Sequence, residues 1–126
     1  MVYCSRNAWV QLRYNGSTKV ETSNDGVTVT GNVTANSDRR LKENITTLDS
    51  SLTKVLKMRG VSFEWRDTTM GEGEQIGFIA QEMQEVEPRL VKEGNVDEHG
   101  NQYLTVAYPS LTAHLVEAIK EQNTRS

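Results

Sequence analysis

The sequence predicts an α+β fold in which a strand-rich first part is followed by a helix-rich second part. Residues 1–36 are rich in Thr, Asn and Gly, and their short apolar and polar runs are typical of strands and tight turns. From Leu41 onward, apolar residues recur at helical spacing instead. The chain has 126 residues, of which only 36% are hydrophobic. Because a chain this small and polar buries little apolar surface alone, we expect several chains to share a core.

The first part is expected to consist of short strands joined by tight turns. Asn15-Gly16 and Asp25-Gly26 both favour the positive φ angles that tight turns require. Residues 27–30 alternate valine with threonine, as strands do. Such strands are too short and polar to form a stable sheet alone. We therefore expect an interwound β-helix, in which neighbouring chains complete one another's strand pairing.

The second part is expected to begin with a helix that ends before Gly60. Residues 61–65 then alternate as a half-buried strand, and residues 67–74 read as an exposed loop or hairpin tip because they hold two glycines and three acids. One helical stripe carries the apolar residues of the first helix together with one arginine: Ile45, Leu48, Leu52, Val55, Leu56 and Arg59.

Two more helices and a strand pair are expected after this loop. Residues 75–80 predict a buried strand that enters a helix, which Pro88 ends. Residues 90–91 and 103–106 are expected to pair as strands, and Pro109 suits the first turn of a last helix. The apolar stripe of that helix, expected in the core of the domain and its assembly, is Leu111, Leu115, Ala118 and Ile119.

Composition argues against several kinds of partner. The net charge is −3 and no large Lys/Arg cluster is present, so we expect no nucleic-acid partner. No apolar run approaches the roughly 20 residues that span a bilayer, so we expect no membrane partner. Cys4 is the only cysteine, which excludes an internal disulfide and a cysteine metal cluster. The sequence predicts no cofactor.

The remaining titratable residues predict no metal site. His99 lies in a short acidic turn, which is a poor metal site, and His114 at helical spacing is expected to be a buried or interfacial histidine with satisfied hydrogen bonds. Solvated loop and helix faces are expected to carry five acids: Glu72, Glu74, Glu82, Glu85 and Glu87.

The junction between the two parts, residues 37–45, carries a possible nucleophile and base. A serine hydroxyl is a poor nucleophile until a base removes its proton. Lysine is such a base only when it is neutral, which burial or neighbouring positive charge favours. Since both histidines lie far along the chain, Lys42 is the base available to Ser37.

Helix geometry restricts how this pair can meet. Five residues of α-helix rotate by about 500°, which leaves Ser37 and Lys42 about 140° apart on one helix. The pair therefore requires an extended or turn conformation at Ser37, or a lysine from a neighbouring chain. We expect Asp38 to be an N-cap at this boundary.

Several blocks of residues carry a resemblance to a known family. They are Ser37-Asp38-Arg39-Arg40-Leu41-Lys42-Glu43-Asn44-Ile45, Phe63-Glu64-Trp65, Ile76-Gly77-Phe78-Ile79-Ala80-Gln81-Glu82, Pro88-Arg89-Leu90-Val91, and Tyr108-Pro109-Ser110-Leu111 through Val116-Glu117-Ala118-Ile119-Lys120-Glu121. In this order and spacing, residues 37–126 resemble the intramolecular chaperone domain of phage tailspikes and tail fibres, the endosialidase-type chaperone classed as peptidase family S74.

The resemblance implies a homotrimeric domain with long helices and β-hairpin arms. It implies that three chains are held together while an upstream triple β-helix folds, and that the domain then releases itself by autoproteolysis with a Ser-Lys dyad. Carried over to this sequence, Ser37 is the nucleophile, Lys42 the base and Ser37–Asp38 the scissile bond. Because an N→O acyl shift ordinarily breaks the bond before the serine, Asn36–Ser37 is the alternative. The motif also includes Asp38, expected to position the pair, and Arg39 and Asn44, whose roles it does not specify.

The resemblance also implies how the chain is organised. Residues 1–36 would be the end of a β-helical client, and residues 37–126 the chaperone. The start at Met1-Val2 suggests an excerpt from a larger protein. Assembly is expected in the host cytoplasm, with the mature client in the virion tail and the chaperone part released. The alternatives are a structural trimerisation cap that does not cleave and, more remotely, a receptor-binding tip. Whether the dyad acts within one chain or between chains stays open.

Overall fold

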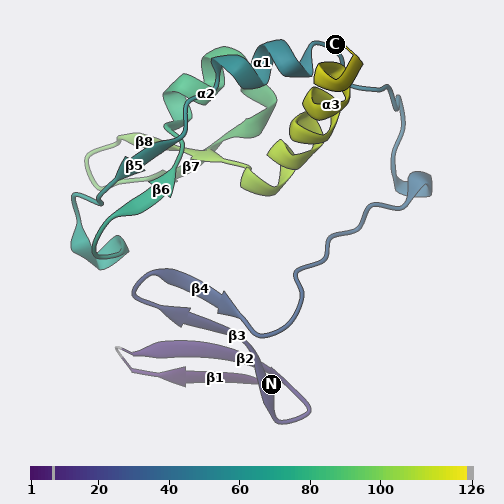
Figure 1. Ribbon diagram of the computed structural model, residues 1–126. Helices are drawn as coiled ribbons and strands as arrows, with labels where there is room; N and C mark the ends of the chain where they lie inside the picture. The colour runs from purple at the N-terminus through teal and green to yellow at the C-terminus, as the bar shows by residue number, and fades with distance from the viewer. Residues whose placement is uncertain (7, 125–126) are drawn as a thin grey trace. The chain divides into compact units, whose positions relative to one another are not determined.

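The computed structural model describes residues 1–6 and 8–124 and has the α+β composition that the sequence predicts (Figure 1). The chain forms two compact units. Unit 1 comprises Met1–Asn44 and Phe63–Gln75, and unit 2 comprises Ile45–Ser62 and Ile76–Ser126. In the described part of the chain, no helix is long and apolar enough to cross a membrane.

Unit 1 contains a four-stranded antiparallel sheet in the order β1-β2-β3-β4 (Figure 1). The strands are β1 (Val2–Ser5), β2 (Trp9–Tyr14), β3 (Ser17–Ser23) and β4 (Gly26–Val29). Between β2 and β3, Asn15 and Gly16 take φ angles of 52° and 84°, so the tight turn predicted there is confirmed. The four strands pair within one chain. The interwound β-helix stays a prediction about an assembly of chains.

The first helix is shorter than expected. Helix α1 spans Ser51–Lys57, whereas the apolar stripe predicted a helix from Ile45 to Arg59. Asn44 and Ser50 both adopt the left-handed conformation, with φ angles of 56° and 55°. Residues in this region interrupt a right-handed helix, so the stretch between them is not helical. The prediction of helix over residues 45–50 was therefore wrong.

The segment after α1 forms a small hairpin. Strands β5 (Val61–Phe63) and β6 (Gln75–Gly77) make a two-stranded sheet, so the strand expected over residues 61–65 ends early. The 3₁₀ helix η2 (Thr68–Met70) lies between them. Asp67 begins η2 by accepting a hydrogen bond of 3.0 Å from the Thr69 amide. The loop predicted at residues 67–74 is confirmed, and most of it is exposed.

The rest of unit 2 follows the predicted order. Helix α2 (Ala80–Val86) ends before η3 (Pro88–Leu90), as expected from Pro88. Strands β7 (Val91–Val96) and β8 (Gln102–Val106) pair antiparallel, with Val91 opposite Val106, which confirms the strand pairing. Helix α3 (Leu111–Thr124) follows η4 (Tyr108–Ser110). The apolar core of this unit comprises Met83, Leu90, Val91 and Leu111.

Helix α3 packs against α1 with only part of its apolar stripe (Figure 1). It buries Leu111 and Ala118, while Leu115 and Ile119 remain 41% and 66% exposed. The Glu121 carboxylate accepts a hydrogen bond of 2.6 Å from the Leu52 amide in the first turn of α1. Since Ser50 makes no side-chain cap there, α3 supplies an acceptor that this helix start lacks.

Candidate functional site

Ser37 and Lys42 are in direct contact. The Lys42 ammonium nitrogen Nζ lies 2.7 Å from the Ser37 hydroxyl oxygen Oγ, within hydrogen-bond distance. Residues 37–42 do not form one α-helix, in agreement with the rotation argument. Instead Ser37 precedes a single 3₁₀ turn, η1 (Arg39–Leu41), and Lys42 follows it in extended conformation, with φ −123° and ψ 152°. The turn folds the chain back far enough for the Ser37 hydroxyl and the Lys42 amine to meet.

Asp38 holds this turn in place and is the N-cap that the sequence predicts. Its Oδ1 accepts hydrogen bonds from the Arg40 backbone amide at 2.8 Å and from Arg40 Nε at 3.1 Å. Its Oδ2 accepts one from Arg40 Nη2 at 2.8 Å. The Arg40 side chain, followed by the Arg40 amide, lowers the pKa of Asp38. The ionised carboxylate is therefore the form that fixes the bend between Ser37 and Lys42.

The other motif residues lie around the pair without joining it. Within the described residues, the structure gives no side-chain hydrogen bond for Arg39, Asn44 or Asn36. Asn44 has a φ angle of 56°, which asparagine tolerates better than most residues. The Asn36–Ser37 and Ser37–Asp38 peptide bonds both flank the hydroxyl oxygen.

The Ser37–Lys42 pair is open to solvent in the single chain. Every residue from 31 to 47 is exposed, and η1 buries none of its residues. A lysine becomes a base where burial disfavours its charged form. The chain thus brings the two side chains together but does not itself exclude water from them.

Unit 2 contains a second polar cluster, built on Ser51, His114 and Glu87. The Ser51 hydroxyl lies 2.9 Å from His114 Nδ1, and His114 Nε2 lies 2.8 Å from Glu87 Oε1. The three residues are 0%, 3% and 3% exposed. A serine-histidine-carboxylate series has the connectivity of a hydrolase triad. Here the serine is fully enclosed, so no substrate reaches it, and the series acts as a clamp that joins α1, α3 and the start of η3.

The clamp confirms one sequence prediction and overturns another. His114 is a buried histidine with satisfied hydrogen bonds, as expected. Glu87 was expected on a solvated face, and this is wrong, because the side chain is buried. Besides the contact with His114, it accepts hydrogen bonds from Arg89 Nη2 at 2.7 Å and from Lys54 Nζ at 3.2 Å. The interactions with these three cationic or polar partners offset the free-energy cost of burying the carboxylate. A histidine in an apolar stripe signalled the clamp, but nothing local marked Ser51.

Acid is expected to weaken unit 2 through Glu87. The Arg89 side chain, followed by His114 and Lys54, lowers the Glu87 pKa from its ordinary 4.5 despite burial. A depressed folded-state pKa stabilises the fold above the unfolded pKa, and this contribution is lost as the pH falls below about 4.5 toward the folded value. Urea unfolding at pH 7, 5, 4 and 3 should show that the wild type has a higher free energy of unfolding than Glu87→Gln at neutral pH, and that this difference shrinks as the pH falls. An advantage that stays constant down to pH 3 would contradict this assignment.

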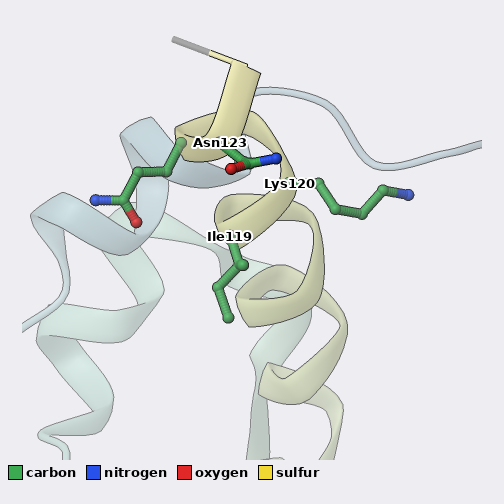
Figure 2. Close-up of a pocket in the computed structure, with 4 residues that line it drawn as sticks. Ile119, Lys120 and Asn123 are labelled. Atoms are coloured by element: carbon green, nitrogen blue, oxygen red, sulfur yellow. The ribbon is translucent and has the colours of Figure 1, made fainter. Parts of the chain in front are cut away.

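Two surface hollows of the described chain assemble no further reactive site. One is lined by Ile119, Lys120, Gln122 and Asn123 at the end of α3, and Figure 2 shows the labelled side chains projecting from that single helix. The other lies beside the clamp and includes Arg89, Ser110 and His114. Among the described residues, no group of three or more His, Cys, Asp or Glu side chains is arranged to hold a metal ion.

Comparison with known proteins identifies the region that begins at the Ser37–Lys42 pair. The family model described as chaperone of endosialidase, Peptidase S74, matches residues 37–92. Two curated relatives, the long tail fiber proteins Gp37 of Enterobacteria phages K3 and T2, are each 38% identical over 96 residues. The alignment covers 75% of this chain, whereas it spans only 8% and 7% of those two fibre proteins.

The family match begins at Ser37, the residue that the turn at η1 brings into contact with Lys42. The tail-fibre relatives are similar over a stretch longer than the family match. The chain therefore carries, over residues 37–92, a domain of the endosialidase-chaperone family, Peptidase S74, and this domain is of the phage tail-fibre type.

Proposed function

We propose that residues 37–126 are a homotrimeric intramolecular chaperone that releases itself by Ser-Lys autoproteolysis. The domain would hold three chains while an upstream triple β-helix of a tail fibre or tailspike folds, with residues 1–36 at the end of that client. Assembly would take place in the host cytoplasm, the folded client would pass to the virion tail, and the chaperone part would be released. The observation that carries the proposal is the 2.7 Å contact between Lys42 Nζ and Ser37 Oγ at the start of the family match.

Cleavage at Asn36–Ser37 would proceed within one chain. Ser37 Oγ, losing its proton to neutral Lys42, attacks the Asn36 carbonyl carbon and closes a five-membered ring. The carbon–nitrogen bond breaks, the Ser37 nitrogen takes up the proton, and an ester joins Asn36 to Ser37 Oγ. Water then hydrolyses the ester, giving a carboxylate on Asn36 and a free hydroxyl on Ser37.

Cleavage at Ser37–Asp38, the bond we favour from the family resemblance, makes a different demand. Attack by Ser37 Oγ on its own carbonyl carbon would close a strained four-membered ring. The hydroxyl of Ser37 in a neighbouring chain meets no such constraint. It would form an ester with the Ser37 carbonyl and release the Asp38 amine, before water hydrolyses the ester. This route makes cleavage depend on assembly.

Association of chains also supplies what the single chain lacks. Ser37 and Lys42 are both exposed. A neutral amine and a reactive hydroxyl both require a site from which water is excluded. Neighbouring chains around the junction would provide that site, so the paired side chains would react only after the chains have come together.

Mass spectrometry of the cleaved chain tests both the bond and the route. We expect new termini at Ser37 and Asp38, and we expect tagged Ser37→Ala chains to be cut when mixed, unfolded and refolded with wild type. Homotrimers of Ser37→Ala are the control and stay intact. New termini at Asn36 and Ser37, with no cutting of the tagged chain in mixtures, would establish the route within one chain instead.

A trimerisation cap that does not cleave is the second candidate. The exposure of Ser37 and Lys42 favours it, as does the naming of both relatives as fibre proteins. A cap would give trimers that stay at full length indefinitely. A self-cleaving chaperone gives trimers whose full-length chains disappear with time.

A further inference from the structure

One face of the β1–β4 sheet is apolar, and residues 1–6 and 8–124 leave much of it exposed. The strand register places Val2, Leu12, Val20 and Val29 side by side across all four strands. Residues paired across strands point to the same side of a sheet. Val2 and Leu12 are 59% and 46% exposed, so this row of aliphatic side chains meets solvent.

A second row lies next to the first on the same side. Cys4 pairs with Val10, and Thr22 pairs with Val27. The Val10 amide donates a hydrogen bond of 2.8 Å to Thr22 Oγ1, which joins the two pairs. Val27 is 63% exposed, and Cys4 is exposed as well. We call these two rows the apolar face. Neither row contains a charged side chain.

The opposite face of the sheet needs no partner. Its central row pairs Tyr3 with Gln11 and Gln11 with Glu21. Gln11 donates to Glu21 at 3.1 Å and accepts from Arg13 Nη2 at 2.8 Å, while the Arg13 guanidinium carbon lies 4.5 Å from the centre of the Tyr3 ring. Gln11 is only 8% exposed, because its own neighbours cover it. The two sides of the sheet therefore differ. The polar groups of the Gln11 side form hydrogen bonds with one another, whereas the apolar face has exposed aliphatic side chains.

The size of the apolar face indicates what covers it. Four strands about 4.8 Å apart and three residues long present roughly 200 Å² of sheet. A stable interface between separate proteins buries about 800 Å² on each partner. The face is too small to capture a partner from solution, but a tethered partner meets it at an effective concentration in the millimolar range. Other copies of this chain, held together through residues 37–126, would be tethered in this way.

We propose that the apolar face of each β1–β4 sheet packs against the same faces of the other copies of the chain. This rests on the proposed trimer and adds the surface through which the end of the client assembles. Each chain would contribute one wall, with Val10 and Val27 facing the axis and the Gln11 side facing solvent. The contact would be made by side chains, because the four strands already pair within their own chain.

Cys4 provides the test, because it lies on the apolar face beside Val10. We expect maleimide to label Cys4 of the assembled, still uncut chain at least about tenfold more slowly than a cysteine in an unstructured peptide, since labelling needs a reachable thiolate. Val27→Lys, which places a charge in the contact, should restore fast labelling. Thr28→Lys is the matched control on the opposite face of the same strand, and its Cys4 should stay protected.

Sedimentation and gel analysis of the same samples separate the outcomes. Trimers that label Cys4 at the peptide rate while their chains are still uncut, and that cleave afterwards, would overturn the packed apolar face and leave the proposed function standing. Cys4 protected equally in a monomer would also overturn it, because another part of the same chain would then cover the face. Full-length monomers without cleavage would instead count against the proposed trimeric chaperone.

Discussion

Replacing Lys42 by alanine is expected to slow self-cleavage by about 100- to 10,000-fold, because a positioned base contributes a factor of this size. Ser37→Ala should abolish the reaction, since it removes the attacking oxygen. The measurement is a time course on denaturing gels, following the fragment of residues 38–126. Sedimentation of each variant shows whether the trimer has formed, so that a loss of assembly is not taken for a loss of chemistry.

Lys42→Arg separates a base from a structural contact. Arginine keeps the positive charge and can donate to Ser37 Oγ, but its guanidinium does not give up a proton in proteins. If Lys42 is the base, Lys42→Arg is as inactive as Lys42→Ala. If the 2.7 Å contact only shapes the turn, arginine restores cleavage, and the dyad assignment is wrong. Lys57→Ala, an exposed lysine in α1, is the control and should cleave at the wild-type rate.

His114→Ala is expected to lower the free energy of unfolding by about 2–4 kcal/mol, because it leaves the buried Ser51 hydroxyl and one bond to Glu87 without a partner. Domains of this kind have only about 5–15 kcal/mol in total, so the variant should unfold at a clearly lower urea concentration. Urea unfolding followed by circular dichroism measures the difference.

The second histidine of the chain is the matched control. His99 is 76% exposed, and His99→Ala should change stability by no more than about 0.5 kcal/mol. Equal unfolding midpoints for His114→Ala and His99→Ala would show that the clamp does not stabilise unit 2. The Ser37–Lys42 contact lies in the other unit, so His114→Ala should affect cleavage only through assembly.

Local signals predicted much of the fold. The turn at Asn15-Gly16, the end of α2 before Pro88 and the pairing of β7 with β8 each depend on residues close in sequence or on simple alternation. The Ser37–Lys42 contact also depends on residues close in sequence. A continuous helix would keep the two side chains apart, so within one chain an extended or turn conformation was needed to bring them together. Whether the pair is catalytic is a different matter, which rests on the family and on the proposed experiments.

The errors arose where distant residues decide the structure. The helix expected from Ile45 begins only at Ser51. There the Glu121 carboxylate of α3 accepts a hydrogen bond from the Leu52 amide. The apolar stripe carried no sign of the left-handed residues at positions 44 and 50. Glu87 looked like one of several solvated acids, and its burial depends on Lys54, Arg89 and His114 meeting around it. No pattern near Glu87 reveals those partners.

The Ser37–Lys42 contact spans one short turn, and this has a consequence for timing. Closing a loop of about ten residues takes roughly 10–100 ns, whereas subunit assembly takes milliseconds to minutes. The two side chains can thus meet long before the chains associate, and repeated early encounters in water are harmless. Association with neighbouring chains, which removes that water, would then be the slow step that determines when the bond is cut.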